Sequence, residues 1–237
     1  MKQLLALPFI LFCLGSFSQD KIVYDKNAQV RNVGSFNAIK VSGAIELSLT
    51  QSDAEAVAVS ADEVKYRDNI KTEVLNGVLT ISYNSEGLHW NMGSKTLKAY
   101  VSFKQIKSLD ISGASSCKIT GTLNIPDLKL KLSGASSITG SITINNLDLQ
   151  GSGASNAKLS GTATKLAINV SGASDIKSYD LTANDCTVTA SGASDIHVTV
   201  KNELSAHVSG ASSLNYKGTP SVKESHSSGA SSISRKD

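Results

Sequence analysis

Two aspartates stand at the same position in two copies of a short motif. The tetrapeptide SGAS is followed at once by Asp175 in one copy and by Asp195 in the next, and Lys177 and His197 come two residues later. If the copies lie on neighbouring strands, about 4.8 Å apart, the two carboxylates could raise the pKa of one of them or bind a calcium ion. Alternatively, Lys177 neutralises the carboxylates on a solvated surface, and this aspartate ladder binds no ligand.

Other residue types that could do chemistry lack the partners that such chemistry needs. Cys117 and Cys186 have no histidine or cysteine at a metal-ligand spacing, and no serine lies in a G-x-S-x-G elbow. The position held by Asp175 and Asp195 is serine or asparagine in the other copies, so no acidic groove of the kind that a polysaccharide-cleaving enzyme uses extends along the chain. We therefore expect no catalytic residues, no cofactor and no enzyme activity.

The motif that carries these residues is repeated along more than half of the chain. SGAS recurs seven times at spacings of 18 to 21 residues, and its first serines are Ser112, Ser133, Ser152, Ser171, Ser191, Ser209 and Ser228. A repeat of about twenty residues indicates a solenoid, in which each unit stacks on the one before.

Apolar and polar residues alternate on both sides of the motif. The residues five, three and one before the first serine are apolar or small in the interior copies, as in Leu128, Leu130 and Leu132, and the residues between them are mostly polar. The residue five after the serine is apolar in every copy, as in Ile176 and Ile196. This period of two predicts a strand before SGAS and another after it, each with one face inward.

SGAS itself is then a corner between two faces of the solenoid. Glycine accepts the positive φ of a corner, and we expect the alanine to point inward at the bend. A further glycine in several copies, at Gly121, Gly140, Gly161 or Gly218, indicates a second corner. The predicted fold is all-β, a single-stranded parallel β-helix with about 19 residues per turn. Cys117 and Cys186 then point inward more than three turns apart, as buried free thiols beyond disulfide reach.

Residues 31–111 precede the repeats and also alternate, so we expect strands and a loop there. SGA at Ser42 suggests an early use of the same corner, and Asn76-Gly77 between two alternating runs is a hairpin signal. The loop of residues 84–96 holds Trp90, which is either a contact residue for a ligand or a ring that packs on the side or end of the solenoid. After Lys217 polar residues replace the inward apolar ones, which predicts a degenerate last turn.

The first 18 residues have the features of a secretory signal peptide. Lys2 precedes an apolar run from Leu4 to Leu14, and small residues follow up to Ser18, where cleavage is expected. Cys13 raises lipidation as an alternative, although the bulky Phe12 stands where a lipobox has a small residue. No later run approaches the ~20 apolar residues of a transmembrane helix. Residues 19–237 then form one exported domain, which is periplasmic, outer-membrane-associated or extracellular.

The charge and the aromatic content bear on the partners. The net charge is +3, from 23 basic and 20 acidic residues, and this balance argues against nucleic acid as a partner. Sugars usually stack on aromatic rings, yet residues 112–237 contain only Tyr179 and Tyr216. Glycan recognition would therefore depend mainly on hydrogen bonds from serine, asparagine and aspartate side chains.

Three stretches together resemble a known family. They read R-N-V-G-S-F-N-A-I-K-V-S-G-A-I-E-L from Arg31, T-E-V-L-N-G-V-L-T-I from Thr72, and the reiterated L-x-L-S-G-A-S. The chain thus resembles the putative auto-transporter adhesin, head GIN domain family of exported bacterial proteins, typical of Bacteroidetes. The resemblance implies a right-handed parallel β-helix and an adhesive role, and it supplies no catalytic residues.

The sequence favours a non-enzymatic, extracytoplasmic solenoid that acts as an adhesin or as a scaffold of the cell envelope. Its partner would be a glycan or a cell-surface protein. Two alternatives remain open, a polysaccharide-binding module and a polysaccharide-degrading β-helix enzyme. The surface candidates for ligand binding are Asp175, Asp195, Lys177, His197 and Trp90.

Overall fold

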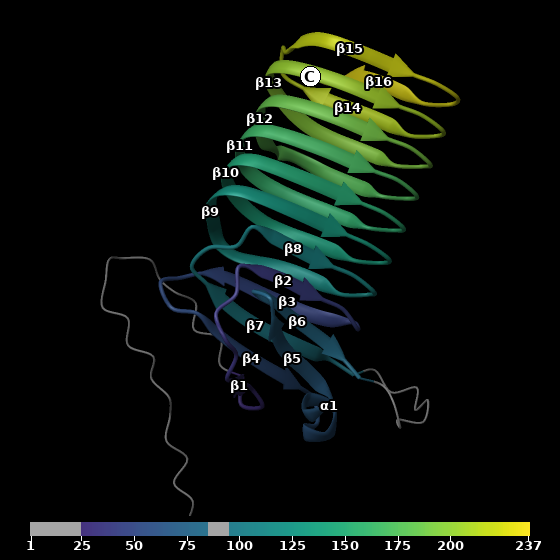
Figure 1. Ribbon diagram of the computed structural model, residues 1–237. Helices are drawn as coiled ribbons and strands as arrows, with labels where there is room; N and C mark the ends of the chain where they lie inside the picture. The colour runs from purple at the N-terminus through teal and green to yellow at the C-terminus, as the bar shows by residue number, and fades with distance from the viewer. Residues whose placement is uncertain (1–24, 85–94) are drawn as a thin grey trace, which may run out of the picture.

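Alternating apolar residues fold this chain into a β-solenoid, seen from the side in Figure 1. The computed structural model describes residues 25–84 and 95–237. The predicted signal peptide, Cys13 and Trp90 lie outside these residues. Each turn of the solenoid, called a coil below, has about 19 residues.

Five long strands form the repeated part of the solenoid, and each continues around a bend. They are β9 (Ser116–Leu132), β10 (Ser137–Gly151), β11 (Asn156–Val170), β12 (Asp175–Ala190) and β13 (Asp195–Val208). Each pairs in parallel with the next, so that Leu128 lies beside Leu147 and Leu147 beside Leu166. The predicted parallel β-helix is therefore confirmed.

The interior is a column of aliphatic side chains from stacked coils. The predicted inward positions are buried in the repeats, as Leu147, Leu149 and Ile196 show at 2% exposure or less. Full burial of an aliphatic side chain stabilises the fold by roughly 1.5–3 kcal/mol. Ile233 occupies the repeat position of Ile196 in the last coil, and it is only partly buried because no further coil covers it.

The prediction for the alanine of SGAS is wrong. Ala173 and its equivalents are exposed, whereas the second serine of the motif is buried in six copies. These inward serines are Ser115, Ser136, Ser155, Ser174, Ser194 and Ser212. The inversion has a physical reason, because a serine hydroxyl can bond to the polar backbone of the corner and an alanine methyl cannot. Ser174 Oγ, for example, donates to the Ser171 carbonyl at 2.8 Å.

The glycine of the motif is required by close stacking of the corners. The seven motif glycines have φ between +70° and +81°. Ala173 N donates to the Gly153 carbonyl of the coil below at 2.7 Å, so the backbone ladder continues through the corner. A Cβ on Gly172 would lie 2.6 Å from that same oxygen. The second corner is also confirmed, since Gly140 and Gly161 stand where the pairing register shifts.

The coils before the repeats are stacked out of sequence order. β2 (Ala38–Val41) and β3 (Ile45–Gln51) form a coil with the predicted early corner at Ser42, and it stacks below β8 (Ser108–Ile111) and the start of β9. On its other side β2 and β3 pair with β6 (Val78–Tyr83) and β7 (Leu97–Phe103). The β2–β3 coil therefore lies between two coils that come later in the chain.

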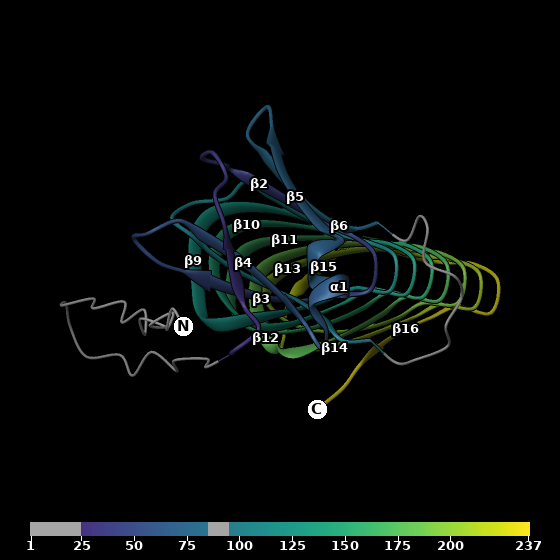
Figure 2. The ribbon, with the colours of Figure 1, turned by 90° about the horizontal axis from the view of Figure 1, so that it is seen from below.

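Antiparallel strands and a short helix close the N-terminal end of the stack (Figure 2). β4 (Ala56–Ala61) pairs with β7 and with β1 (Gln29–Arg31), and β5 (Ile70–Leu75) pairs with β6. The β5–β6 hairpin turns at Asn76 and Gly77, both with positive φ, as predicted. The helix is α1 (Val64–Asp68). No helix within the described residues has the length and apolar character to cross a membrane.

The C-terminal end is formed by the predicted degenerate coil. It follows β14 (Ser213–Lys217) and consists of β15 (Ser221–Ser227) and β16 (Ser232–Arg235). All seven residues of β15 are exposed, and Ser225 pairs with Ala206, an inward residue of the coil below. Serine at inward positions reduces the apolar surface that meets water at this end, where Val222 is the exposed apolar residue of β15.

Candidate functional site

The structure brings the four predicted ladder residues together on one outer face. Asp175 and Asp195 are Cα partners on β12 and β13, and Lys177 and His197 are partners two residues further along. They lie directly after the SGAS corner, on strands whose alternate residues fill the core. The strand register thus holds all four side chains on the solvent side.

Asp175 forms an ion pair within its own strand. Lys177 Nζ lies 2.5 Å from Asp175 Oδ2, and this hydrogen bond together with the aspartate charge raises the pKa of Lys177. The Lys177 side chain is 59% exposed, so solvent screens the pair and its contribution to stability is small. The buried oxygen Asp175 Oδ1 has no hydrogen-bond partner in the protein.

Asp195 is the better-connected carboxylate of the ladder. His197 Nε2 lies 2.8 Å from its Oδ2, while Ser213 Oγ and Asn215 Nδ2 donate to its Oδ1 at 2.5 and 3.3 Å. Partial burial raises the pKa of Asp195, but the hydrogen bonds and the neighbouring His197 outweigh it, and the net pKa is lowered. The carboxylate is thus held ionised by three partners.

An aromatic ring extends the cluster beyond the predicted residues. The Tyr179 and His197 rings meet edge to face at 4.8 Å, and Lys217 Nζ lies 5.0 Å from the centre of the Tyr179 ring. The sequence analysis missed the parts played by Ser213, Asn215 and Lys217. The repeat contained the signal for two of them, because Ser213 and Asn215 occupy the motif positions of Asp195 and His197 in the next coil.

This arrangement can do little chemistry. Each carboxylate already has a cation or imidazole of its own, and three of the four oxygens have partners in the protein. Within the described part of the chain no three His, Cys, Asp or Glu side chains are grouped so that they could hold a metal ion. The geometry suits a polar network that ties β12, β13 and β14 together better than a calcium site.

The two thiols of the repeats are buried in the core, as predicted. Cys117 and Cys186 are both free, and burial raises the pKa of each to about 12. A thiolate, the reactive form, is therefore almost absent at neutral pH.

Comparisons with known proteins agree with this architecture. A family model described as putative auto-transporter adhesin, head GIN domain, matches residues 35–220. The chain is similar to the crystal structure of a putative adhesin from Bacteroides fragilis, with a TM-score of 0.80 and 22% identity over 89% of this chain and 98% of that one. The comparison with curated proteins found no match.

Two further solved structures share the fold. A putative adhesin from Parabacteroides merdae has a TM-score of 0.70 and 17% identity, over 89% of this chain and 95% of that one. A putative lipid binding protein from Parabacteroides distasonis has a TM-score of 0.64 and 22% identity, over 90% and 98% of the two chains. At such identities the likeness concerns the fold alone.

Proposed function

The chain belongs to the putative auto-transporter adhesin, head GIN domain family, and on that premise we propose that it is an exported, non-enzymatic adhesin of the bacterial cell envelope. Its partner is a glycan or a protein on a cell surface. Its place is outside the cytoplasm, in the periplasm, at the outer membrane or beyond it.

The observation that carries this proposal is the filled interior of the solenoid. Aliphatic side chains from successive coils close the core from β2 to β14, and the inward residues are almost without solvent exposure. A ligand must therefore be recognised on the outer surface, where strand register aligns polar side chains in long rows. A rigid surface with repeated polar groups is suited to holding an extended partner.

The filled interior also bears on the alternative that one structural neighbour suggests. That neighbour is named a putative lipid binding protein. In the described coils of this chain the interior is occupied by aliphatic side chains that are almost without solvent exposure. Binding at the surface, as an adhesin binds, is the better-supported function.

A polysaccharide-binding module is the second candidate. It is favoured by the outer rows of amide, hydroxyl and imidazole side chains, which hydrogen-bond to sugars without needing a charge. It is weakened by the small number of aromatic rings on the repeats. The two candidates differ in whether binding to cells depends on a surface glycan.

The test is a binding screen of residues 19–237 against a glycan array and against whole bacterial and host cells. The wild type is compared with an Asp175→Asn/Asp195→Asn variant, with calcium and with a chelator. Specific, saturable binding to cells or glycans is expected. Loss of binding in the variant or in the chelator would make the aspartate ladder part of the site. Catalytic turnover of a polysaccharide, or no binding to any cell or glycan, would contradict the proposal.

A further inference from the structure

Two shallow hollows on the outer surface occupy the same position in the repeat. One is lined by Lys131, Gln150 and Asn169 with the backbone of the neighbouring corner. The other is lined by Thr189, His207 and His226 with three motif serines, Ser191, Ser209 and Ser228. Both lie between the exposed SGAS corners and the side chain two residues before the motif. The outer surface along this repeat position, which includes both hollows, is called the corner groove below.

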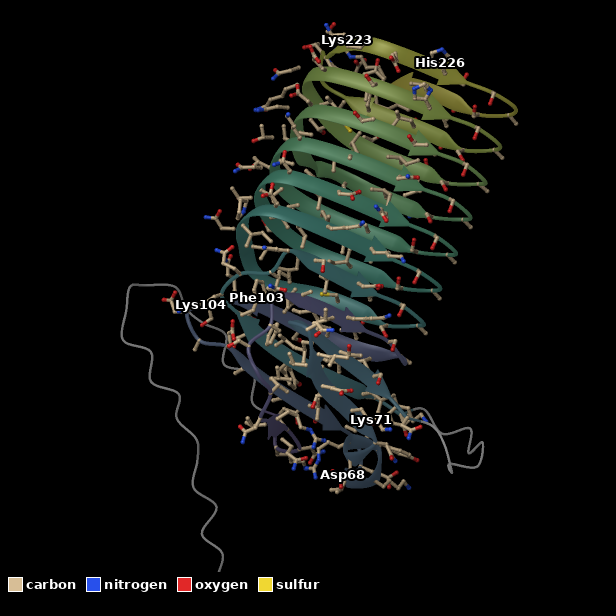
Figure 3. The ribbon with its side chains drawn as sticks, viewed as in Figure 1. Asp68, Lys71, Phe103, Lys104, Lys223 and His226 are labelled. Atoms are coloured by element: carbon tan, nitrogen blue, oxygen red, sulfur yellow. The ribbon has the colours of Figure 1, made fainter. Side chains whose placement is uncertain are left out.

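One wall of the corner groove is a continuous row of polar side chains. Its members are successive Cα partners from β9 to β15: Lys131, Gln150, Asn169, Thr189, His207 and His226. Parallel strands place such partners about 4.8 Å apart, so the row is about 24 Å long. His226, at the last position of the row, is labelled in Figure 3 near the arrowhead of β15.

The chemistry of this row is nearly neutral. It offers two amides, a hydroxyl and two imidazoles, and Lys131 at its first position is the one residue with a fixed charge. Gln150 Nε2 donates to Asp148 at 3.1 Å, and His207 Nε2 lies 3.0 Å from Glu224 Oε2, so nearby carboxylates orient two of the side chains. The His207 and His226 rings are stacked at 4.9 Å and nearly parallel, and they add carbon surface to the groove.

From this geometry we propose that the corner groove binds a linear, uncharged polysaccharide that lies along the solenoid axis with about one sugar per coil. In an extended chain of linked hexoses, each sugar advances by about the distance between neighbouring coils. Each sugar therefore meets an equivalent set of donors and acceptors. This inference deepens the proposed adhesive function and rests on it, because it names the ligand class and the surface.

Other extended polymers fit the corner groove less well. A peptide that joined the sheet would need unpaired backbone groups, but here the backbone is bonded from coil to coil, as from Ser152 N to the Leu132 carbonyl at 3.0 Å. An acidic polymer would need a row of cations, and only Lys131 supplies a permanent one. Neutral hydroxyl-rich chains match both the spacing and the charge.

Affinity should then grow with the length of the ligand. Each sugar gains a few hydrogen bonds that are weak in water, and only a chain that spans several coils adds enough of them. We expect a neutral hexasaccharide to bind at least tenfold more tightly than its disaccharide. Longer polymers should gain little more, because the row has six members.

The experiment measures equilibrium binding to cellohexaose, laminarihexaose and mannohexaose, to the matching disaccharides and to an acidic oligogalacturonate. Residues 19–237 are compared with the variants Asn169→Ala and His207→Ala. The control is Asn156→Ala, an exposed asparagine on the other side of the SGAS corner. All three changed side chains are exposed, so thermal melting should be unaltered.

At least one neutral hexasaccharide is expected to bind. Asn169→Ala and His207→Ala should weaken that binding by tenfold or more, and Asn156→Ala should not change it. No binding to any neutral hexasaccharide, or equal binding by the groove variants and the wild type, would overturn the inference. If the protein still adhered to cells in that case, the proposed function would stand and only this assignment would fail. Stronger binding to the acidic oligogalacturonate would likewise overturn it.

Discussion

The buried serines of the motif differ in whether their hydroxyl groups have a hydrogen-bond partner. Ser174 Oγ donates to the Ser171 carbonyl and lies 3.1 Å from Ser155 Oγ, whereas Ser136 Oγ is buried without any partner. A buried hydroxyl without a partner lowers the stability of the fold, because it loses its hydrogen bonds to water. A hydrogen bond within the protein offsets that loss. The same residue at the same repeat position therefore stabilises one coil and destabilises another.

Alanine substitution should reveal this difference. Ser136→Ala removes an unpaired polar atom and is expected to raise the free energy of unfolding by up to about 1 kcal/mol. Ser174→Ala breaks two hydrogen bonds and should lower it by about 1–2 kcal/mol. Thermal or denaturant unfolding of the two variants provides the measurement. Equal losses in both would show that Ser136 has a partner after all.

The Asp195 carboxylate should make stability depend on pH in the acid range. Its pKa is lower in the folded protein than the ordinary aspartate value of about 3.9, so its ionised form stabilises the fold at pH values above about 4. That contribution is lost as the pH falls through the folded pKa. Because the side chain is 46% exposed, we expect Asp195→Asn to cost only about 1 kcal/mol at pH 7.

Melting of the Asp195→Asn variant and the wild type at pH 7 and pH 3 tests this sign. The difference in melting temperature should be a few degrees at pH 7 and should shrink at pH 3. A difference that stayed constant, or grew as the pH fell, would mean that the carboxylate is not ionised in the folded protein.

At the residue scale the sequence predicted side-chain direction well where residues are large. Leu147 and Ile196 could only be inward, because their exposure to water is unfavourable. Ala173 and Ser174 are both small enough for either side of a corner, and the choice depends on a hydroxyl contact with Ser171 that spacing cannot reveal. The repeat likewise places Ser213 and Asn215 beside Asp195 and His197 in the next coil, but it does not reveal that both side chains donate hydrogen bonds to the Asp195 carboxylate.

Among the elements, the SGAS corner tolerates the least change. Gly172 has a φ of +75°, and an added Cβ would meet the carbonyl oxygen that accepts the bond from Ala173 N. Gly172→Ala should therefore cost about 3 kcal/mol or more, from backbone strain and a lost inter-coil hydrogen bond. Ala173→Ser, at the exposed neighbour, is the matched control and should change stability by less than about 0.5 kcal/mol.

Urea unfolding of these two variants shows whether the corner requires glycine at position 172 or is destabilised by any substitution. If Gly172→Ala were as stable as the wild type, the close approach between stacked corners could not be as described.

The strands were largely evident from the sequence, but the pairing of the strands before the repeats was not. Alternation indicates which residues of a strand face inward, and the constant period implies that each repeat stacks on the previous one. Residues 31–111 keep the alternation but lack the constant period, and there β2 and β3 pair with strands that come later in the chain. Alternation alone does not specify which of these strands pair with one another. The interleaved order is therefore visible only in the structure.

For the whole molecule, this order predicts unequal tolerance of truncation. Removing residues 218–237 takes away β15 and β16, which are mostly exposed and cover one end. Removing residues 25–51 takes away the β2–β3 coil from between two others and exposes the interior on both sides.

The C-terminal truncation should therefore stay folded, with a lower melting temperature, and the N-terminal one should not fold. Circular dichroism and limited proteolysis of the two proteins would show this. A folded N-terminal truncation would contradict the stacking order.

The direction of the hydrogen bonds between coils also makes the solenoid a mechanical element. These bonds point along the long axis of the solenoid. A pull on the C-terminus would therefore break the bonds of one coil at a time, starting from that end. Each released coil lengthens the tether by about nineteen residues and absorbs energy before the next one yields. At the other end β7 is paired on both sides, with β3 and with β4, so two ladders must break together. Pulling single molecules from the C-terminus should give an evenly spaced series of low-force steps that ends in one stronger rupture.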